Sequence, residues 1–187
     1  RRAAKMVCLD LDHPDIEEFI NWKVVEEQKV AAMVTGSKVC AQRLNAVLKA
    51  CHVVDGAGQM KIEVDAKQNP ILREAMGAAR RDAVPEAYIQ RMFSYAQQGF
   101  THFVFHEYDT NWDGKAYQTV SGQNSNNSVR IPNDFFAVLE ADGDWQLKRR
   151  IDGKVSKTIK ARDLWDQIAW AAWICADPGT QYDTTIN

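Results

Sequence analysis

The sequence holds 187 residues, of which 45% are hydrophobic and 26% are charged, and its formal net charge at pH 7 is −2. A chain of this length can bury the core of one domain, or of a large part of one. The near-balanced charge gives no indication of sequence-independent nucleic-acid binding, and no apolar run reaches the ~18 residues that a membrane span needs.

The first third of the chain is expected to hold one strand and two helices. Residues 5–12 have the apolar character of a buried strand in a parallel sheet. Pro14 then opens a helix, because proline loses no needed hydrogen bond at a first helical position and the acidic residues after it complement the helix dipole. Gly36 and Ser37 are expected to restart the chain into a second helix, whose apolar residues recur at helical spacing.

The middle of the chain is expected to be mostly helical. Residues 55–59 indicate a loop, and a helical stretch begins at about Asn69. Pro85 breaks this stretch into two pieces, because proline cannot continue the hydrogen-bond pattern of a helix. The second piece ends at Gly99, a residue that suits a left-handed cap.

Residues 102–108 alternate as a strand does, and they are followed by a long polar loop over 109–126. A loop of this length inside a domain is more often functional than filler. His102 and His106 would point to the same face of the strand with about 13 Å between their Cα atoms. That separation is too wide for both rings to bind one zinc ion, so no metal site is predicted.

Residues 127–131 form a short predicted strand ended by a proline, and a helix over 134–141 follows. Asn133 is expected to cap this helix through its side chain, because asparagine is a favoured N-cap residue. Gly143 is expected to close the helix.

The last part of the chain predicts a hairpin, a helix and a strand. Asp152 and Gly153 stand between two alternating segments, 145–151 and 154–159, which is a strong hairpin signal. The helix is expected over 160–176 and the strand over 181–186. Strands separated by helices imply an α/β fold with a parallel sheet, on which the hairpin is a decoration.

The sequence carries no local motif that names a reaction. It has no nucleophile elbow, no phosphate-binding glycine loop and no CxxC pair. The cysteines are scattered, which favours reduced thiols in a cytoplasmic protein. Six tryptophans are interpreted as core or interface residues, and the helix that holds three of them is expected to be covered on two sides.

Three blocks, in this order, resemble the catalytic chain of class II, adenosylcobalamin-dependent ribonucleotide reductases. The first block is Arg1-Arg2-Ala3-Ala4-Lys5-Met6 through His13-Pro14-Asp15-Ile16, followed by Phe19-Ile20-x-Trp22-Lys23. The second is residues 127–136, continuing to Gly143-Asp144-Trp145-x-Leu147, and the third is residues 161–165 through Ala176-Asp177-Pro178-Gly179 to residues 183–187. Each block is moderately specific alone, but the ordered set covers nearly the whole chain.

The resemblance implies a partial ribonucleotide-reductase-type barrel, which in the family is a ten-stranded α/β barrel built from two five-stranded halves. We expect residues 1–187 to form a single partial barrel domain. Residues 36–126 are expected to be a longer insertion of the adenosylcobalamin-dependent branch. The chain is accordingly expected to be an internal piece of a larger enzyme.

The resemblance also implies thiyl-radical chemistry that converts ribonucleotides to deoxyribonucleotides. Adenosylcobalamin generates the radical on a cysteine within an Asn-x-Cys-x-Glu motif, and a further cysteine pair supplies electrons. These 187 residues lack that motif, and none of the four cysteines (Cys8, Cys40, Cys51 and Cys175) matches a radical or redox position. No catalytic residue is therefore predicted, and the chain alone is expected to be inactive and doubtful as a cofactor binder.

Three residues are candidates for contact with nucleotides. Arg1 matches an arginine of the family's specificity loop, which senses the effector, and Asn127 and Ser128 begin a barrel strand whose end could face the substrate. The implied partners are a ribonucleotide, deoxynucleotide or ATP effectors, and the rest of the same barrel. Open sheet edges would favour self-association of the chain by itself. No direct nucleic-acid or membrane partner is expected.

Two other interpretations remain open at this stage. The chain could be a non-catalytic nucleotide-binding or assembly module that reuses half of the barrel. It could also be a relative in the wider glycyl-radical enzyme group, which is similar in barrel architecture. The His13-Pro14-Asp15-Ile16 and Gly143-Asp144-Trp145 blocks favour the reductase interpretation over the latter.

Overall fold

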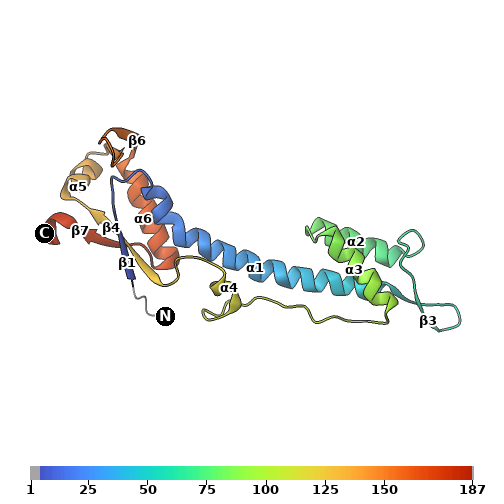
Figure 1. The fold of residues 1–187 in the computed structure, drawn as a ribbon. Helices are drawn as coiled ribbons and strands as arrows, with labels where there is room; N and C mark the ends of the chain where they lie inside the picture. Colours follow the sequence, from blue (N-terminus) through green and yellow to red (C-terminus); the bar gives the residue numbers. More distant parts are fainter. Residues whose placement is uncertain (1–4, 187) are drawn as a thin grey trace. The chain divides into compact units, whose positions relative to one another are not determined.

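The computed structural model describes residues 5–186, and the chain divides into two compact units (Figure 1). The sheet unit comprises the residues up to Val30 and those from Tyr117 onward, and the helical unit comprises Ala31–Ala116. Helix α1 (Ile16–Ala50) begins in the sheet unit and ends in the helical unit. Within residues 5–186, no helix has the length and apolar character required to cross a membrane.

Three parallel strands form the sheet of the sheet unit, in the order β1-β4-β7. Their bounds are Lys5–Asp10 for β1, Ser125–Ile131 for β4 and Gly179–Tyr182 for β7. The register places Cys8 beside Ser128, and Ser128 beside Gly179. The predicted parallel α/β arrangement is confirmed by this pairing, although the three strands leave the sheet open.

One face of this sheet is covered by helices. The start of α1, helix α5 (Asn133–Glu140) and helix α6 (Ala161–Cys175) share a single apolar core with Val129 and Ile131 of β4. Alternate residues of a strand point to opposite faces, so these two side chains define the helix-covered face. Burying each aliphatic side chain of this size contributes roughly 1.5–3 kcal/mol.

The predicted hairpin is confirmed. Strands β5 (Asp144–Lys148) and β6 (Val155–Lys160) pair antiparallel, and Gly153 in the turn has a φ of 69°. Only a residue that tolerates the left-handed region fits this turn position without strain, which is why the Asp-Gly pair marked it in the sequence.

Three predictions in the sheet unit are wrong in detail. Asn133 does not cap α5 through its side chain: the N-cap is Pro132, and the backbone N–H of Asn133 donates to Thr184 Oγ1 at 3.1 Å. The left-handed residue after α5 is Asp142, with φ 50°, while Gly143 N–H donates to the Val138 carbonyl at 2.8 Å.

The third concerns the final strand, which ends at Tyr182 rather than at residue 186. Tyr182 pairs with Ile131, and the next residue of β4 is Pro132, which has no N–H to extend the ladder. The chain instead forms a short helix, α7 (Asp183–Ile186).

The helical unit is built from the end of α1, a small hairpin and two helices. Strands β2 (His52–Val54) and β3 (Met60–Ile62) pair antiparallel around the predicted loop. Helices α2 (Pro70–Arg81) and α3 (Glu86–Gln97) confirm the predicted break at Pro85. Their apolar faces pack on α1 around Leu48, Leu72 and Ile89.

The predicted restart at Gly36 is wrong, because α1 is continuous from residue 16 to residue 50. Glycine inside a helix costs about 1 kcal/mol relative to alanine. That cost is small beside the burial of Val34, Ala41 and Leu44 on either side of it. Ser37 also stays within the helix, where its hydroxyl donates to the Val34 carbonyl at 3.0 Å.

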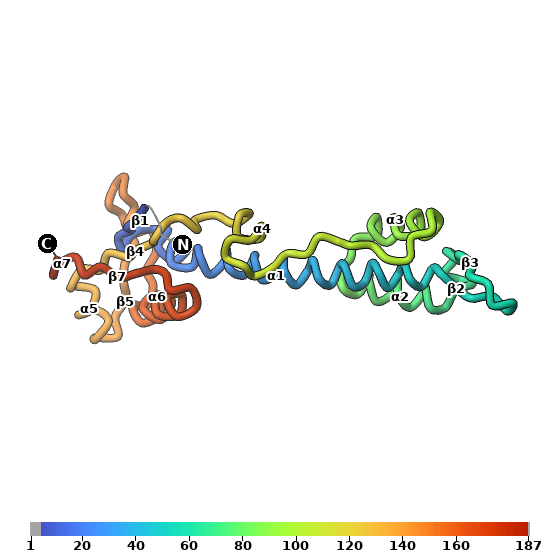
Figure 2. The backbone as a smooth tube through the Cα atoms, turned by 90° about the horizontal axis from the view of Figure 1, so that it is seen from below, coloured from blue at the N-terminus to red at the C-terminus, as the bar shows by residue number. Residues whose placement is uncertain are grey.

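The predicted strand over 102–108 is also wrong, because this extended segment pairs with no other strand of the part of the chain that the structure describes. It runs beside α1 (Figure 2) and is held there by side chains rather than by a ladder. The long polar stretch after it contains one short helix, α4 (Lys115–Gln118).

Candidate functional site

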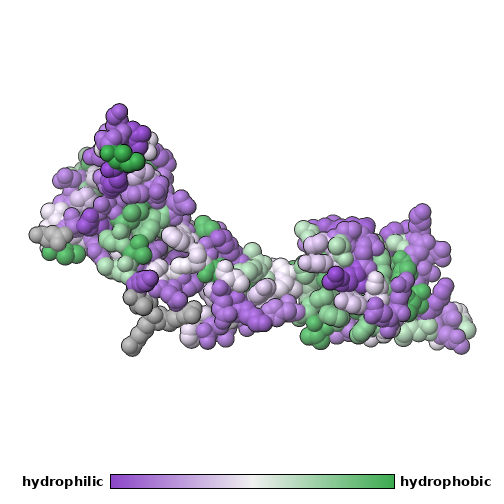
Figure 3. All heavy atoms as spheres, viewed as in Figure 1, coloured by the Kyte–Doolittle hydropathy of each residue, from purple (hydrophilic) through white to green (hydrophobic). Residues whose placement is uncertain are grey.

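The face of the sheet opposite the helices carries polar and sulfur-containing side chains. We call it the open sheet face and define it by Met6, Cys8 and Asp10 of β1, Ser128 and Arg130 of β4, and Gln181 of β7. Parallel sheets are normally buried on both faces, whereas Met6 and Cys8 are exposed on this one. Figure 3 shows hydrophobic residues at the surface over the region of this sheet as well.

Hydrogen bonds connect the outer strands of this face across β4. The Cys8 thiol donates to Gln181 Oε1 at 3.8 Å, and the Gln181 amide nitrogen lies 3.2 Å from Met6 Sδ. Ser128 lies between them, beside Gly179, where an added Cβ would be 3.4 Å from Ser128 Oγ. Because Ser128 and Gly179 are small, no bulky side chain stands at the centre of this face.

Arginines and carboxylates cluster at the carboxyl ends of the strands. Arg130 donates to Asp10 through Nε at 2.6 Å, and Arg150 pairs with Asp12 at 2.5 Å and with Asp10 at 3.5 Å. The hydrogen bond that Arg130 donates to Asp10 raises the pKa of Arg130, so the guanidinium stays charged. Ligands of open α/β sheets bind at this edge.

A cavity of about 470 Å³ opens at the same edge, beside α5 and the hairpin. Five carboxylates and two cationic side chains are among its lining residues: Asp10, Asp12, Asp134, Asp144, Asp183, Arg130 and Lys148. No group of three His, Cys, Asp or Glu side chains within residues 5–186 is arranged to hold a metal ion. Because carboxylates outnumber cationic side chains in the lining, the cavity favours groups that donate hydrogen bonds over anions.

A buried ion pair closes the other end of the strands. The Lys23 ammonium contacts the Asp177 carboxylate, and their side chains are only 16% and 10% exposed. The carboxylate also accepts the backbone N–H of Asn127 at 3.1 Å, and Lys23 donates to the Ser125 carbonyl. The pair thus fixes where β4 begins relative to α1 and the turn after α6.

Carboxylates of α1 extend this polar region. Glu26 accepts from Lys29 at 2.7 Å and from the Ser121 N–H at 3.0 Å, and these bonds, the first above all, lower its pKa. Glu27 accepts the Tyr117 hydroxyl at 2.8 Å, which raises the pKa of that tyrosine.

The structure places the two described candidates, Asn127 and Ser128, on opposite faces of β4. Asn127 is buried at the helix-covered side, where its Oδ1 accepts from Ser125 Oγ at 3.3 Å. Ser128 lies on the open sheet face. Arg1, the third candidate, lies outside the described residues.

Sequence reasoning missed the other members of the open sheet face. Asp10 and Arg130 belong to predicted strands, and the alternation within each strand was readable. What the sequence lacked was the register that places Asp10 beside Arg130 and Arg130 beside Gln181. Lys23 and Asp177 both lie in the family-like blocks, but their pairing was missed because 154 positions separate them and nothing in the sequence shows that they meet.

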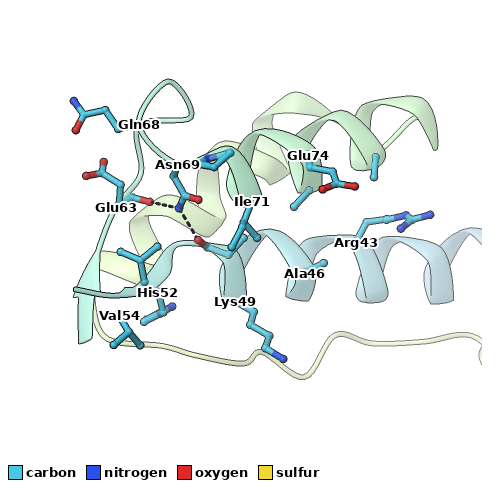
Figure 4. Close-up of a pocket in the computed structure, with 15 residues that line it drawn as sticks. Arg43, Ala46, Lys49, His52, Val54, Glu63, Gln68, Asn69, Ile71 and Glu74 are labelled. Atoms are coloured by element: carbon cyan, nitrogen blue, oxygen red, sulfur yellow. Dashed lines mark hydrogen bonds between the residues drawn. The ribbon is translucent and has the colours of Figure 1, made fainter. Parts of the chain in front are cut away.

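The helical unit has a larger cavity, of about 850 Å³, between the end of α1, β2 and the start of α2. Figure 4 shows its buried amide, Asn69, reaching the carbonyls of Ala50 and Glu63, at 2.7 and 3.3 Å. The same side chain caps α2 by accepting the Leu72 N–H at 3.0 Å. Because these bonds use the amide for the fold, we assign no ligand to this cavity.

Comparison with known proteins gives a consistent result over the full length. A family model described as "Ribonucleotide reductase, barrel domain" matches residues 1–187. The chain is similar over all 187 residues to the vitamin B12-dependent ribonucleotide reductases of Bradyrhizobium diazoefficiens, at 56% identity, and Agrobacterium fabrum, at 54%. It is 33% identical to that of Streptomyces avermitilis. The chain spans 15%, 14% and 12% of the length of these relatives, respectively.

Proposed function

Because this chain belongs to the ribonucleotide reductase barrel-domain family, we propose that it forms part of the barrel of an adenosylcobalamin-dependent ribonucleotide reductase. The parent enzyme would convert ribonucleotides to deoxyribonucleotides by a cobalamin-initiated thiyl-radical mechanism. The observation that carries this proposal is the 56% identity, across every residue of the chain, to a vitamin B12-dependent ribonucleotide reductase. Its cytoplasmic location is part of the same proposal.

The chain's role in the parent would be that of a barrel wall. Helices α1 and α6 pack on the same face of the parallel sheet, as the outer helices of an α/β barrel do. The open sheet face would then look into the barrel, and further strands of the parent would pair with the free edges of β1 and β7. A ten-stranded barrel with an insertion over 36–126 is the arrangement that we propose.

Exposed tryptophans support a covering by other parts of the parent. Trp170 and Trp173 of α6 are 55% and 78% exposed, and their rings stack with centroids 5.5 Å apart. Paired indoles at a protein surface typically mark a contact surface. This would be the second covered side that the sequence predicts for this helix.

The residues present do not fit adenosylcobalamin. The cavity at the carboxyl end of β1 is lined by five carboxylates, whereas a corrin ring presents a broad apolar surface edged by amides. Cofactor binding is therefore assigned to the rest of the parent, and no step through the cofactor is derived from this chain.

Ser128 is the residue that we propose to face the ribonucleotide, through its hydroxyl on the open sheet face. Asn127 is retained as a proposed substrate-side residue, acting by fixing the start of β4 against Asp177. Arg1 is retained as a proposed effector contact. Ribonucleotide substrate, deoxynucleotide or ATP effectors and the rest of the barrel are the partners proposed for the parent.

The function is tested by assaying the parent protein that contains this chain. Deoxycytidine phosphates formed from CDP and from CTP are quantified with adenosylcobalamin, with hydroxocobalamin, and without either, always with a dithiol that supplies the two electrons consumed in each turnover. Deoxynucleotide formed only with adenosylcobalamin is the expected result. Nucleotide binding without turnover under all three conditions would overturn the proposal and favour a non-catalytic binding module.

A further inference from the structure

The helical unit holds a second, aromatic pocket to which nothing above assigns a role. It lies between α1, α3 and the extended segment 102–108, and its volume is about 340 Å³. Small-molecule sites are typically concave, mostly apolar and upward of about 300 Å³, with a few placed polar groups. We call it the aromatic pocket and define it by Tyr88, Arg91, Tyr95, Phe103, Phe105 and His106.

Side chains of α1 hold the extended segment in position. The Asn45 amide donates to the Phe103 carbonyl and accepts the Phe103 N–H, both at 2.9 Å. Further along, the Ser37 hydroxyl accepts the Tyr108 N–H at 2.9 Å. These two anchors are five residues apart, and Phe105 and His106, which lie between them, line the pocket together with Phe103. The wall is therefore pre-formed, which limits the entropy lost when a ligand binds.

The rings of the pocket present flat faces in two orientations. Phe103 stacks on Tyr95, with centroids 5.0 Å apart and an interplanar angle of 10°. Phe105 is tilted by 47° to Phe103, with centroids 5.1 Å apart. Both phenylalanines and Tyr95 are only half-buried, so part of each ring faces the pocket. Aromatic rings bind planar partners by offset stacking or by edge-to-face contact.

The polar groups of the pocket favour a negatively charged ligand. Arg91 lies at its rim on an exposed position of α3 and makes no ion pair with any residue between 5 and 186. His106 and the Tyr88 hydroxyl are further donors, and no acidic side chain is among the lining residues. In a chain whose net charge is −2, this local charge selects an anion. A guanidinium can bind a carboxylate or a phosphate through two parallel hydrogen bonds.

We propose that the aromatic pocket binds a small planar aromatic molecule that carries a carboxylate or phosphate group. The ring would stack on Phe105 and contact Phe103 at an angle, because the two phenylalanine rings are tilted by 47° to each other. The anionic group would pair with Arg91. A nucleoside monophosphate and an aromatic carboxylic acid share this chemistry. The site lies wholly within the helical unit and is independent of the function proposed for the parent.

Binding is measured with the 187-residue chain by ¹H–¹⁵N NMR titration, which locates each probe as well as its affinity. The nucleotide arm uses AMP, with adenosine as the match without charge and ribose 5-phosphate as the match without an aromatic ring. The aromatic-acid arm uses indole-3-acetate, with indole-3-ethanol as its neutral match. Saturable shifts at residues 88–95 and 103–106 are expected with AMP or indole-3-acetate, and the arm that binds identifies the source of the ligand.

Arg91→Gln removes the charge but keeps the length of the side chain. It is expected to weaken binding of the anion about tenfold or more, because a hydrogen bond to a charged group contributes about 1.5–3 kcal/mol. The matched control is Arg73→Gln, which removes an exposed arginine of α2 outside the pocket and is expected to leave binding within about twofold. Phe105→Leu removes a ring but keeps apolar bulk, and about a fivefold loss is expected from stacking.

Several outcomes would overturn the proposal. Failure of both AMP and indole-3-acetate to bind would be one, and shifts confined to residues outside the pocket would be another. Equal affinity of the charged and neutral probes in both arms would show that the charge plays no part. Equal effects of the Arg91 and Arg73 substitutions would show that Arg91 is not in the site. The spectrum of each variant shows directly whether it retains the fold. A loss of binding therefore counts only where peak dispersion matches that of the unsubstituted chain.

Discussion

The buried ion pair of Lys23 and Asp177 should stabilise the sheet unit, because it links α1 to the turn after α6. Removing one partner of a fully buried ion pair typically costs 3–5 kcal/mol, because the other charge is left without compensation. The side chains here are 16% and 10% exposed, so some water reaches them and about 2–3 kcal/mol is expected for Asp177→Asn. The new amide can still accept the Asn127 N–H, so the loss comes mainly from the stranded ammonium.

Urea unfolding followed by tryptophan fluorescence measures this loss. Five of the six tryptophans lie in the sheet unit, so the signal reports mainly on that unit. Lys23→Met is expected to cost a similar amount, and the double variant should cost about 2 kcal/mol less than the sum of the two. The matched control is Asp152→Asn, which breaks an exposed pair with Arg149 and should change stability by less than about 1 kcal/mol.

A double-variant cost equal to the sum of the single ones would refute the coupling. An Asp177→Asn effect no larger than that of Asp152→Asn would show that water screens the pair, and the positioning of β4 would then have to come from the sheet ladder alone.

Three further predictions follow from single contacts. Arg80 and Gln90 hold the pKa of Glu86 at about 2, below its ordinary 4.5, with the Arg80 hydrogen bond as the main cause. This exposed pair therefore stabilises α3 modestly above about pH 4.5, and its contribution is lost as the pH falls toward 2. Glu86→Gln should remove that part of the pH dependence of stability, as measured by circular-dichroism melts. Burial raises the pKa of Cys51 to about 11, so iodoacetamide at pH 8 should modify Cys51 at least about tenfold more slowly than the exposed Cys8, as resolved by peptide mass spectrometry. Asn69→Ala should lower the melting temperature of the helical unit, because it removes a cap worth about 1 kcal/mol and leaves the Ala50 carbonyl without its amide partner; equal melting would contradict the role given to this side chain.

The sequence predicted well the features that depend on local backbone chemistry. The hairpin at Gly153 and the break before α3 at Pro85 follow from the φ that each residue allows. The continuous α1 was not predictable in this way, because the cost of Gly36 is local while the packing of Leu44 and Val34 that outweighs it is tertiary. The segment 102–108 has the alternation of a strand, but a strand also needs a partner, which alternation alone cannot supply.

In the candidate site, too, local features were predictable from the sequence and tertiary ones were not. The family resemblance singled out Asn127 and Ser128 as neighbours in sequence, yet neighbours in a strand face opposite ways. Only the pairing of β4 with β1 and β7 shows that Ser128 shares a face with Cys8 and Gln181. Sequence reasoning could locate the strand but not the surface to which each residue contributes.

The claim that this chain is a barrel wall is tested most directly at Cys8. In the 187-residue chain this thiol is exposed on the open sheet face, and a maleimide carrying a bulky polyethylene glycol should modify it readily. In the parent protein the same face would look into the barrel, so mass spectrometry should find Cys8 protected from that reagent. Equally fast modification of Cys8 in the parent and in the chain would contradict the barrel-wall account.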